Sequence, residues 1–442
     1  MFAWRLVRQA IQRLGWGVAD QGMSSISNFA VNIYIARSLG AAEYGAFSLA
    51  YVTYGFALNA SRGLATDPLL VRYSDADVKR WRRAVAQCTG TAVITGLATG
   101  SCVLLASVLI GGTAGLAFLA LGLTLPALML QDSWRYSFFA LRRGGHAFLN
   151  DTVWTVVLIP ALFVLKQTGH ATVFWFVLAW GASAGVAACI GPLQAKVMPK
   201  LTGVVSWVML NKDLGPRYLL EGTANSASGQ IRNYGISLIL GLTSLGYVQA
   251  ASTLMGPFMV IFFGMGLVIL PEAARVLRRS PKRLPVFCAL VSTGLALAGL
   301  AWGILLLVGL PLGLGQTVLG QLWRPTYPLI LPSTIQIIGG CVQAGAGAGL
   351  HALGAARRSL RAMIISSALL VVCGLAGAFW GGAAGTIWGN AIASCIGAVI
   401  FWQQLRVALR DHNDEGGRTK TRQPGRHRGM AGAVSQRNES HT

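Results

Sequence analysis

Apolar and polar stretches alternate along the whole chain, and twelve apolar stretches are long enough to form helices across a hydrocarbon layer of roughly 30 Å. They cover residues 16–38, 46–70, 84–109, 113–131, 152–166, 172–193, 219–241, 247–270, 285–309, 328–350, 361–380 and 384–404. In lipid, the backbone must satisfy its own hydrogen bonds, which helices do within one segment. The pattern therefore predicts an all-α polytopic membrane protein with about twelve transmembrane helices.

The positive charges mark alternate loops. Of the 36 Lys and Arg residues, 31 fall before the first apolar stretch, after every second one, or in the C-terminal tail. Short loops rich in Lys and Arg stay on the cytoplasmic side, so both termini are expected inside. The stretch 152–166 is the weakest, because it is short and contains Pro160, which would kink a helix. If it did not cross, every later orientation would be inverted.

The composition narrows the class of protein further. The net charge is +22, but 54% of the residues are hydrophobic and only 11% are charged. That balance is typical of a membrane chain rather than a nucleic-acid partner, and the charge would also attract anionic membrane lipids. The seven cysteines form no C-x-x-C pair, and neither a Walker A run nor an H-E-x-x-H motif is present. We therefore expect no enzyme activity, no metal site and no bound cofactor.

An internal repeat indicates two pseudo-symmetric six-helix bundles. A shift of 201 residues places Ser25 on Ser226, Asn32 on Asn233 and Gly45 on Gly246, among other matches. Six crossings per half is an even number, so the halves are expected to be parallel repeats, with a site between them near the membrane midplane. The predicted divisions are an N-terminal bundle (1–193), a cytoplasmic linker with an interfacial helix (194–218), a C-terminal bundle (219–404) and a disordered basic tail (405–442).

Polar residues follow one face of each of the two repeat-related stretches that begin the halves. They are Asp20, Ser24 and Ser27 in the first, and Glu221, Asn225, Ser228 and Arg232 in the seventh. A polar stripe on a membrane helix faces protein or water rather than lipid, so both stripes are expected to line a central cavity. We interpret the serines, Asn225 and Arg232 as substrate contacts. Asp20 and Glu221 are either coupling or gating carboxylates, or caps and ion-pair partners of cytoplasmic Lys and Arg.

Two arginines lie deep enough to need a partner. Arg232 is about 20 Å along its helix and Arg62 about 12 Å from the inner end of its own, and a guanidinium at such depth is costly unless solvated or paired. Either each locks helices through a buried carboxylate, or it offers a bidentate contact to a phosphate or another anion. Asp67 is not ideally spaced to pair with Arg62. At the inner ends of the stretches, Asp67, Asp132, Asp151 and Glu272 are expected to be salt-bridge partners.

The turn after the first stretch carries a more specific signal. Residues 36–48 read A-R-x-L-G-x-x-x-Y-G-x-F-S, and residues 20–49 as a whole resemble the start of bacterial polysaccharide flippases of the O-antigen (Wzx) type. These belong to the MOP exporter superfamily, beside the MATE drug antiporters and the peptidoglycan lipid flippase. The resemblance implies alternating access by two six-helix bundles in a bacterial cytoplasmic membrane. It also implies a cationic cavity that takes a polyprenyl-pyrophosphate-linked oligosaccharide across the bilayer.

Three functions stay open at this point. The first is a lipid-linked oligosaccharide flippase that works beside polysaccharide polymerase or glycosyltransferase machinery. The second is a MATE-like exporter of small cationic compounds, driven like the first by an unidentified proton or sodium gradient. The third is a membrane enzyme or assembly partner of a polymerase. A cationic cavity favours the first and an acidic cavity the second, whereas the third would need acidic residues or histidines in a long outer loop. The segment 310–327 has none.

Overall fold

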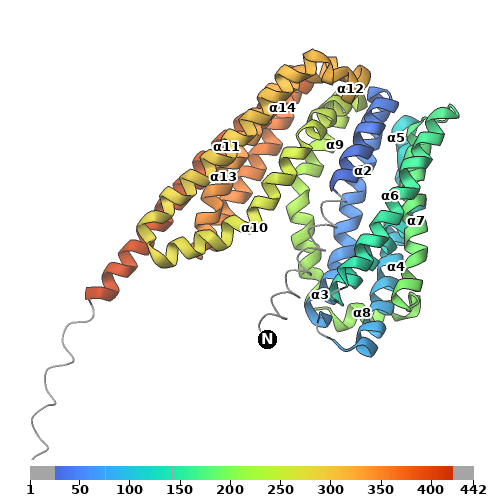
Figure 1. The fold of residues 1–442 in the computed structure, drawn as a ribbon, viewed down its shortest axis with the longest axis horizontal. Helices are drawn as coiled ribbons and strands as arrows, with labels where there is room; N and C mark the ends of the chain where they lie inside the picture. Colours follow the sequence, from blue (N-terminus) through green and yellow to red (C-terminus); the bar gives the residue numbers. More distant parts are fainter. Residues whose placement is uncertain (1–24, 75, 142, 422–442) are drawn as a thin grey trace, which may run out of the picture.

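The computed structural model describes residues 25–74, 76–141 and 143–421, with only the backbone of residues 221–226, 267 and 413–421 (Figure 1). Every regular element in these ranges is a helix, which confirms the all-α expectation. After a helix over residues 25–38, the elements are α2 (Ala41–Ser61), η1 (Arg62–Thr66), α3 (Asp67–Tyr73), α4 (Val78–Ile110), α5 (Gly112–Ala140), α6 (Gly144–Gln167), α7 (Val173–Ala195), η2 (Leu201–Gly203), α8 (Val204–Leu210), α9 (Gly215–Leu254), α10 (Gly256–Arg279), η3 (Pro281–Arg283), α11 (Leu284–Gly309), η4 (Leu310–Leu314), α12 (Gly315–Leu319), η5 (Gly320–Leu322), α13 (Trp323–Ala352) and α14 (Ala356–Thr421).

Two of the long helices reverse direction at glycines. Gly241 has φ 79° inside α9, and Gly382 has φ 59° inside α14. Residues other than glycine rarely adopt such a positive φ. Residues 215–240 and 242–279 therefore form two successive crossings, as do 356–380 and 383–421. With the helix over 25–38 and the segment from α2 to α3 counted, the described residues form twelve successive helical segments, which agrees with the predicted number of transmembrane helices.

The fifth stretch, the weakest in the sequence, is a full-length helix. α6 has 24 residues and is long and apolar enough to cross, with Pro160 retained inside it. The predicted short helix of the linker is also present as α8, where Val205 and Met209 are exposed while Trp207 is buried. At the other end of the chain, α14 continues to Thr421 and buries Leu405 and Ala408. The helical part thus extends past residue 405, where the sequence predicts the disordered tail to begin.

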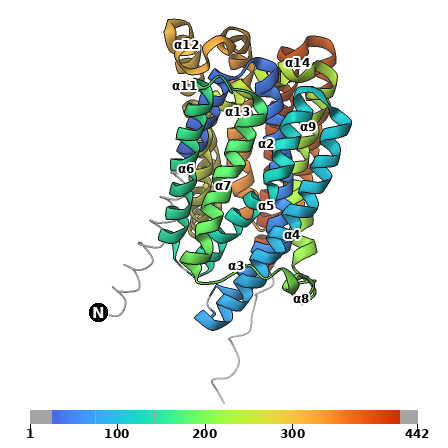
Figure 2. The ribbon, with the colours of Figure 1, turned by 90° about the vertical axis from the view of Figure 1, so that its right-hand side faces the viewer.

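The helices form a V with two arms (Figure 1). One arm holds α2 to α7 and the first part of α9, and Figure 2 shows its helices running side by side. The other holds α10, α11, α13 and most of α14. We call the end where the arms meet, near α12, the apex, and the opposite end the open end. The connections after α3, α5, α7, α10 and α13 all lie at the open end, so the basic loops are gathered there.

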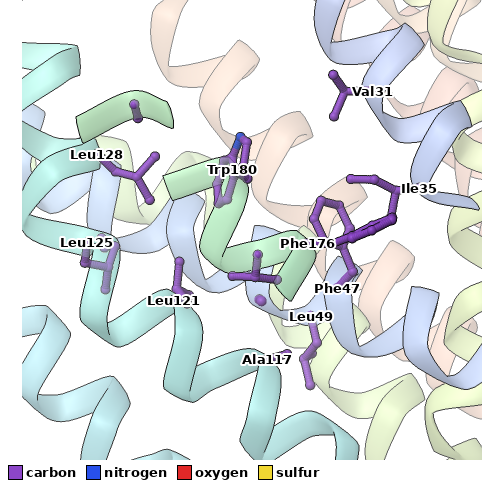
Figure 3. Close-up of a cluster of buried hydrophobic side chains, with 14 of the residues drawn as sticks. Val31, Ile35, Phe47, Leu49, Ala117, Leu121, Leu125, Leu128, Phe176 and Trp180 are labelled. Carbon is purple, nitrogen blue, oxygen red and sulfur yellow. The ribbon is translucent and has the colours of Figure 1, made fainter. Parts of the chain in front are cut away.

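Each arm has its own apolar core. In the first, Phe47, Phe176 and Trp180 pack with Leu121 and Leu125 (Figure 3). The second core includes Phe258, Leu284, Cys288, Cys341 and Leu405. Since lipid is as apolar as these side chains, close van der Waals packing rather than water exclusion holds the helices together.

The apex carries a reciprocal contact between repeat-related residues. A Cβ on Gly45 would lie 1.9 Å from the carbonyl oxygen of Leu242, and a Cβ on Gly246 would lie 2.2 Å from that of Ala41. The internal repeat relates Ala41 to Leu242 and Gly45 to Gly246. Contacts of this exchanged kind are what a two-fold axis produces. The pseudo-symmetry predicted from the sequence therefore has its axis at the apex, where only glycine permits the close approach.

Candidate functional site

A cavity of about 520 Å³ lies between the two halves. Residues 25–32, Tyr51 of α2, the last turns of α9 and the start of α10 line it. Gln249 and Thr253 follow the turn at Gly241 by eight and twelve residues, so the cavity lies about 12–18 Å below the apex. That depth is near the middle of a membrane-spanning layer.

The lining of this cavity is polar but uncharged. Its polar side chains are those of Ser25, Asn28, Asn32, Tyr51, Gln249, Ser252 and Thr253, and none of the described lining residues is ionisable at neutral pH. Asn32 donates its Nδ2 hydrogen to the carbonyl oxygen of Asn28 at 2.9 Å. Thr253 is held by a hydroxyl hydrogen bond of 2.9 Å to the buried Tyr44, which also joins α2 to α9.

Arg232 lies on α9 at a similar depth, about 14 Å below Gly241. Its side chain packs beside Gly374 of α14, where a Cβ would lie 3.4 Å from Arg232 Cδ and 2.6 Å from Asn390 Oδ1. Both Arg232 Nε and Asn390 Oδ1 are buried and have no hydrogen-bond partner. No ion pair joins Arg232 to a carboxylate among the residues whose side chains are described. A buried polar group without a partner costs about 1–3 kcal/mol, and none of the described side chains supplies a partner for this donor and this acceptor.

Arg62 has a different environment. Its Nε and Nη2 donate to the two carboxylate oxygens of Asp132 at 3.0 and 2.7 Å, and its guanidinium lies 4.8 Å from the ring centre of Tyr136. A bidentate pair of this kind is strong and neutralises the charge. Arg62 thus lies within the first arm, whereas Arg232, on the first part of α9, packs on α14 of the second arm. The carboxylate expected for Arg62 is Asp132 of α5.

The other expected ion pairs are partly present. Asp151 lies 3.4 Å from Arg135 Nε and accepts from Gln131 at 2.8 Å inside the first arm, and Glu272 pairs with Arg275 at 3.0 Å. These contacts confirm Asp132, Asp151 and Glu272 as salt-bridge partners. No cluster of three His, Cys, Asp or Glu that could hold a metal ion occurs in the described part of the chain.

The structure describes only some of the remaining predicted site residues. Asp20 and Ser24 lie outside the described residues, and Glu221 and Asn225 are described only as backbone of α9. Ser27 lies towards α6, in a small pocket beside Asp151 and Trp154. Ser228 is half-buried on α9, one turn before Arg232.

The sequence also contains a pattern that indicates the cavity and that was not included in the two predicted polar stripes. Ser25, Asn28 and Asn32 stand at i, i+3 and i+7, which is one helical face, and Ser25 and Asn32 also match Ser226 and Asn233 in the repeat. Gln249, Ser252 and Thr253 also share one helical face, at i, i+3 and i+4, but the sequence does not show that this face meets the first one. The turn at Gly241 and the packing against α2 bring them to the cavity.

Comparisons with known proteins identify the fold. No family model and no curated protein matches the chain. Among solved structures, a multidrug resistance MATE transporter of the MOP superfamily, in an inward-facing conformation, superposes with a TM-score of 0.70 at 14% identity, over 89% of this chain and 96% of that one. The lipid II flippase MurJ, in an inward closed conformation, gives 0.61 at 12% identity, over 89% and 87%.

A third match is a MOP superfamily transporter from Pyrococcus furiosus, described as having a binding pocket of reversed polarity. It gives a TM-score of 0.53 at 14% identity, over 91% of this chain and 95% of that one. At such identities the likeness shows the fold alone. The chain has the fold of the MOP superfamily transporters and is a multi-pass membrane protein with two bundles of helices. Its neighbours are transporters and a flippase rather than enzymes.

Proposed function

We propose that this protein is a flippase that moves a polyprenyl-pyrophosphate-linked oligosaccharide across a bacterial cytoplasmic membrane for the export of a surface glycan. The observation that carries the proposal is Arg232. It is an arginine at membrane depth, between the two arms, without a carboxylate partner among the described side chains. A guanidinium offers paired N–H donors that match the oxygens of a phosphate, and a phosphate oxygen would accept the hydrogen of Arg232 Nε, which has no partner among the described side chains.

The shape of the molecule supports a mechanism of alternating access. The arms are joined at the apex and separated at the open end (Figure 1). The basic loops favour the open end as the cytoplasmic side, so this state would receive substrate from the cytoplasm. A substrate with a charged headgroup and a long apolar tail would place the pyrophosphate and sugars between the arms and leave the polyprenyl chain in lipid.

The other candidate residues keep their predicted roles in this proposal. Arg62, Ser24, Ser27, Asn225 and Ser228 are further substrate contacts. Of these, Arg62 would contact substrate only with its charge already compensated by Asp132.

Asp20 and Glu221 are candidates for coupling to a proton or sodium gradient, or for gating. Membrane lipids and polysaccharide polymerase or glycosyltransferase machinery are the expected partners.

The alternative is an ion-coupled exporter of small cationic compounds, and a multidrug resistance MATE transporter has a similar fold. Such an exporter would be served by carboxylates in the cavity. Among the described residues, the cavity lining has none, and the buried Asp132 and Asp151 are both paired with arginines. The described lining holds no cation either, so the preference for the flippase rests on Arg232, which has no carboxylate partner among the described side chains.

The test is translocation of a polyprenyl-pyrophosphate oligosaccharide in proteoliposomes. We expect transport by the wild type, loss of at least tenfold in Arg232→Gln, and partial recovery in Arg232→Lys, which restores the charge but not the bidentate geometry. Transport by folded Arg232→Gln at the wild-type rate would refute the role of Arg232. Efflux of cationic dyes, without transport of any such lipid, would favour the exporter.

A further inference from the structure

The uncharged cavity between the halves has features of a binding site in its own right. Carboxamides face it from two sides, Asn28 and Asn32 from the first described helix and Gln249 from α9. No described residue makes a hydrogen bond to the side chain of Gln249, which is half-buried. Phe29 and Tyr51 add aromatic surface beside these groups.

The chemistry of the lining excludes two kinds of occupant. An ion would find no counter-charge among the described lining residues. A hydrocarbon chain would bury the Gln249 carboxamide, to which no described residue makes a hydrogen bond, at a cost of about 1–3 kcal/mol. A carboxamide both donates and accepts hydrogen bonds, so the matching ligand is one that carries many groups of the same dual character on a partly apolar frame.

A sugar has this character. Its hydroxyl groups donate and accept, and the C–H faces of its ring pack on aromatic side chains. We propose that the cavity is a saccharide subsite for the uncharged sugar units next to the pyrophosphate. The volume of about 520 Å³ is within the range of roughly 300–1,000 Å³ that encloses a drug-sized ligand, and a disaccharide is of this size.

The position of the cavity agrees with that of Arg232. Both lie about 12–18 Å below the apex, and in this proposal one substrate presents its pyrophosphate to Arg232 and its first sugars to the carboxamides. This inference rests on the proposed function for the identity of the whole substrate. The two sites nevertheless have distinct roles, because Arg232 would recognise any lipid pyrophosphate whereas the cavity would recognise the neutral glycan.

The experiment measures binding to the purified full-length protein by thermophoresis. The probes are undecaprenyl pyrophosphate without sugar, the same lipid with each of several neutral disaccharides, and the same lipid with a disaccharide that contains a uronic acid. The variants are Gln249→Leu and Asn32→Leu in the cavity, and Arg232→Gln. Gln343→Leu is the control outside the cavity, since Gln343 lines a separate groove of the second arm and donates there to the carbonyl oxygen of Ser394.

We expect at least one neutral disaccharide to tighten wild-type binding by tenfold or more over the bare lipid. The uronic acid should reduce this gain, because a carboxylate finds no cation in the lining. Gln249→Leu and Asn32→Leu should remove the gain and leave the affinity for the bare lipid unchanged. Arg232→Gln should weaken all the lipids alike, and Gln343→Leu should change neither quantity.

The two proposals fail separately. If the bare lipid binds through Arg232 but no neutral disaccharide adds affinity, or if the gain survives in both cavity variants, the saccharide subsite is wrong and the flippase remains. If no lipid pyrophosphate binds, yet the free methyl glycoside of a disaccharide binds to the wild type and not to Gln249→Leu, the subsite stands and the flippase is wrong. If neither the lipids nor the free glycosides bind, both are wrong.

Discussion

The two seams between the halves are related by the repeat but packed differently. In one, which we call the closed seam, α2 lies against residues 215–240. In the other, the open seam, the helix over residues 25–38 faces residues 242–260. The internal repeat relates α2 to the stretch that begins at residue 242, and the helix over residues 25–38 to residues 226–239. From the sequence alone, the two seams are therefore expected to pack alike.

The contacts show how far they differ. In the closed seam, a Cβ on Gly63 would lie 2.5 Å from the backbone nitrogen of Leu219, and the hydroxyls of Thr53 and Tyr234 are 2.6 Å apart. The repeat partner of Gly63 is Gly264, which has nothing within 4 Å of such a Cβ. The open seam contains the cavity. The two halves are thus related by symmetry at the apex but not towards the open end. A route for substrate entry requires such a difference, with one seam closed and the other open.

The largest expected effect concerns the ion pair next to the closed seam. Arg62→Met would leave the buried Asp132 carboxylate without its partner, and breaking a buried pair in this way costs about 3–5 kcal/mol. We expect a large fall in the temperature at which folded protein is lost in detergent. The double variant Arg62→Met with Asp132→Leu should recover most of it, since the unpaired charge is gone.

The same pair of variants decides the role of Arg62. If the stable double variant transports lipid-linked oligosaccharide at the wild-type rate, Arg62 is structural and not a substrate contact. If it folds but transports nothing, Arg62 or Asp132 acts in transport itself.

The next effect compares the repeat-related glycines. The added methyl of Gly63→Ala meets the backbone of α9 and forces the seam apart, so this variant should be destabilised by about 1–3 kcal/mol. Gly264→Ala is the matched control and should be neutral or slightly stabilising, since alanine is the better helix former by about 1 kcal/mol. Thermal unfolding of the two variants checks this, and equal behaviour would mean that the seams do not differ as described.

A smaller effect is expected from the hydroxyl pair of the closed seam, Thr53 and Tyr234. Tyr234→Phe should weaken the seam by about 0.5–1.5 kcal/mol, the net contribution of one hydrogen bond. Spin-label distances across the closed seam should show a larger open fraction. Thr53→Val should do the same, and the double variant should add little to either. Additive effects would mean that the two hydroxyls act separately.

The sequence predicted the fold well, because the signals for the fold can be read from the chain without knowing which helix faces meet. Apolar length, loop charge and the internal repeat each follow from the chain alone, and Gly45 and Gly246 occupy the symmetric positions that the repeat implies. The site was predicted less completely, because it depends on which faces meet. Arg62 and Arg232 look alike in sequence, yet Asp132 is 70 residues from the first and no described carboxylate reaches the second. Gln249 belongs to the cavity only through the turn at Gly241.

The smallest expected effect on stability belongs to a substitution that should still affect function. Gly264→Leu adds a side chain where the structure has open space. The free energy of unfolding should therefore stay the same or rise by less than about 1 kcal/mol, since leucine, like alanine, is a better helix former than glycine. If transport requires the open seam to close as tightly as its partner does at Gly63, this side chain will block the closed form, and translocation should fall by at least tenfold. Gly264→Ala should give an intermediate rate. Wild-type transport by Gly264→Leu would mean that the seams do not exchange roles, and that the asymmetry between them is a fixed property of the fold.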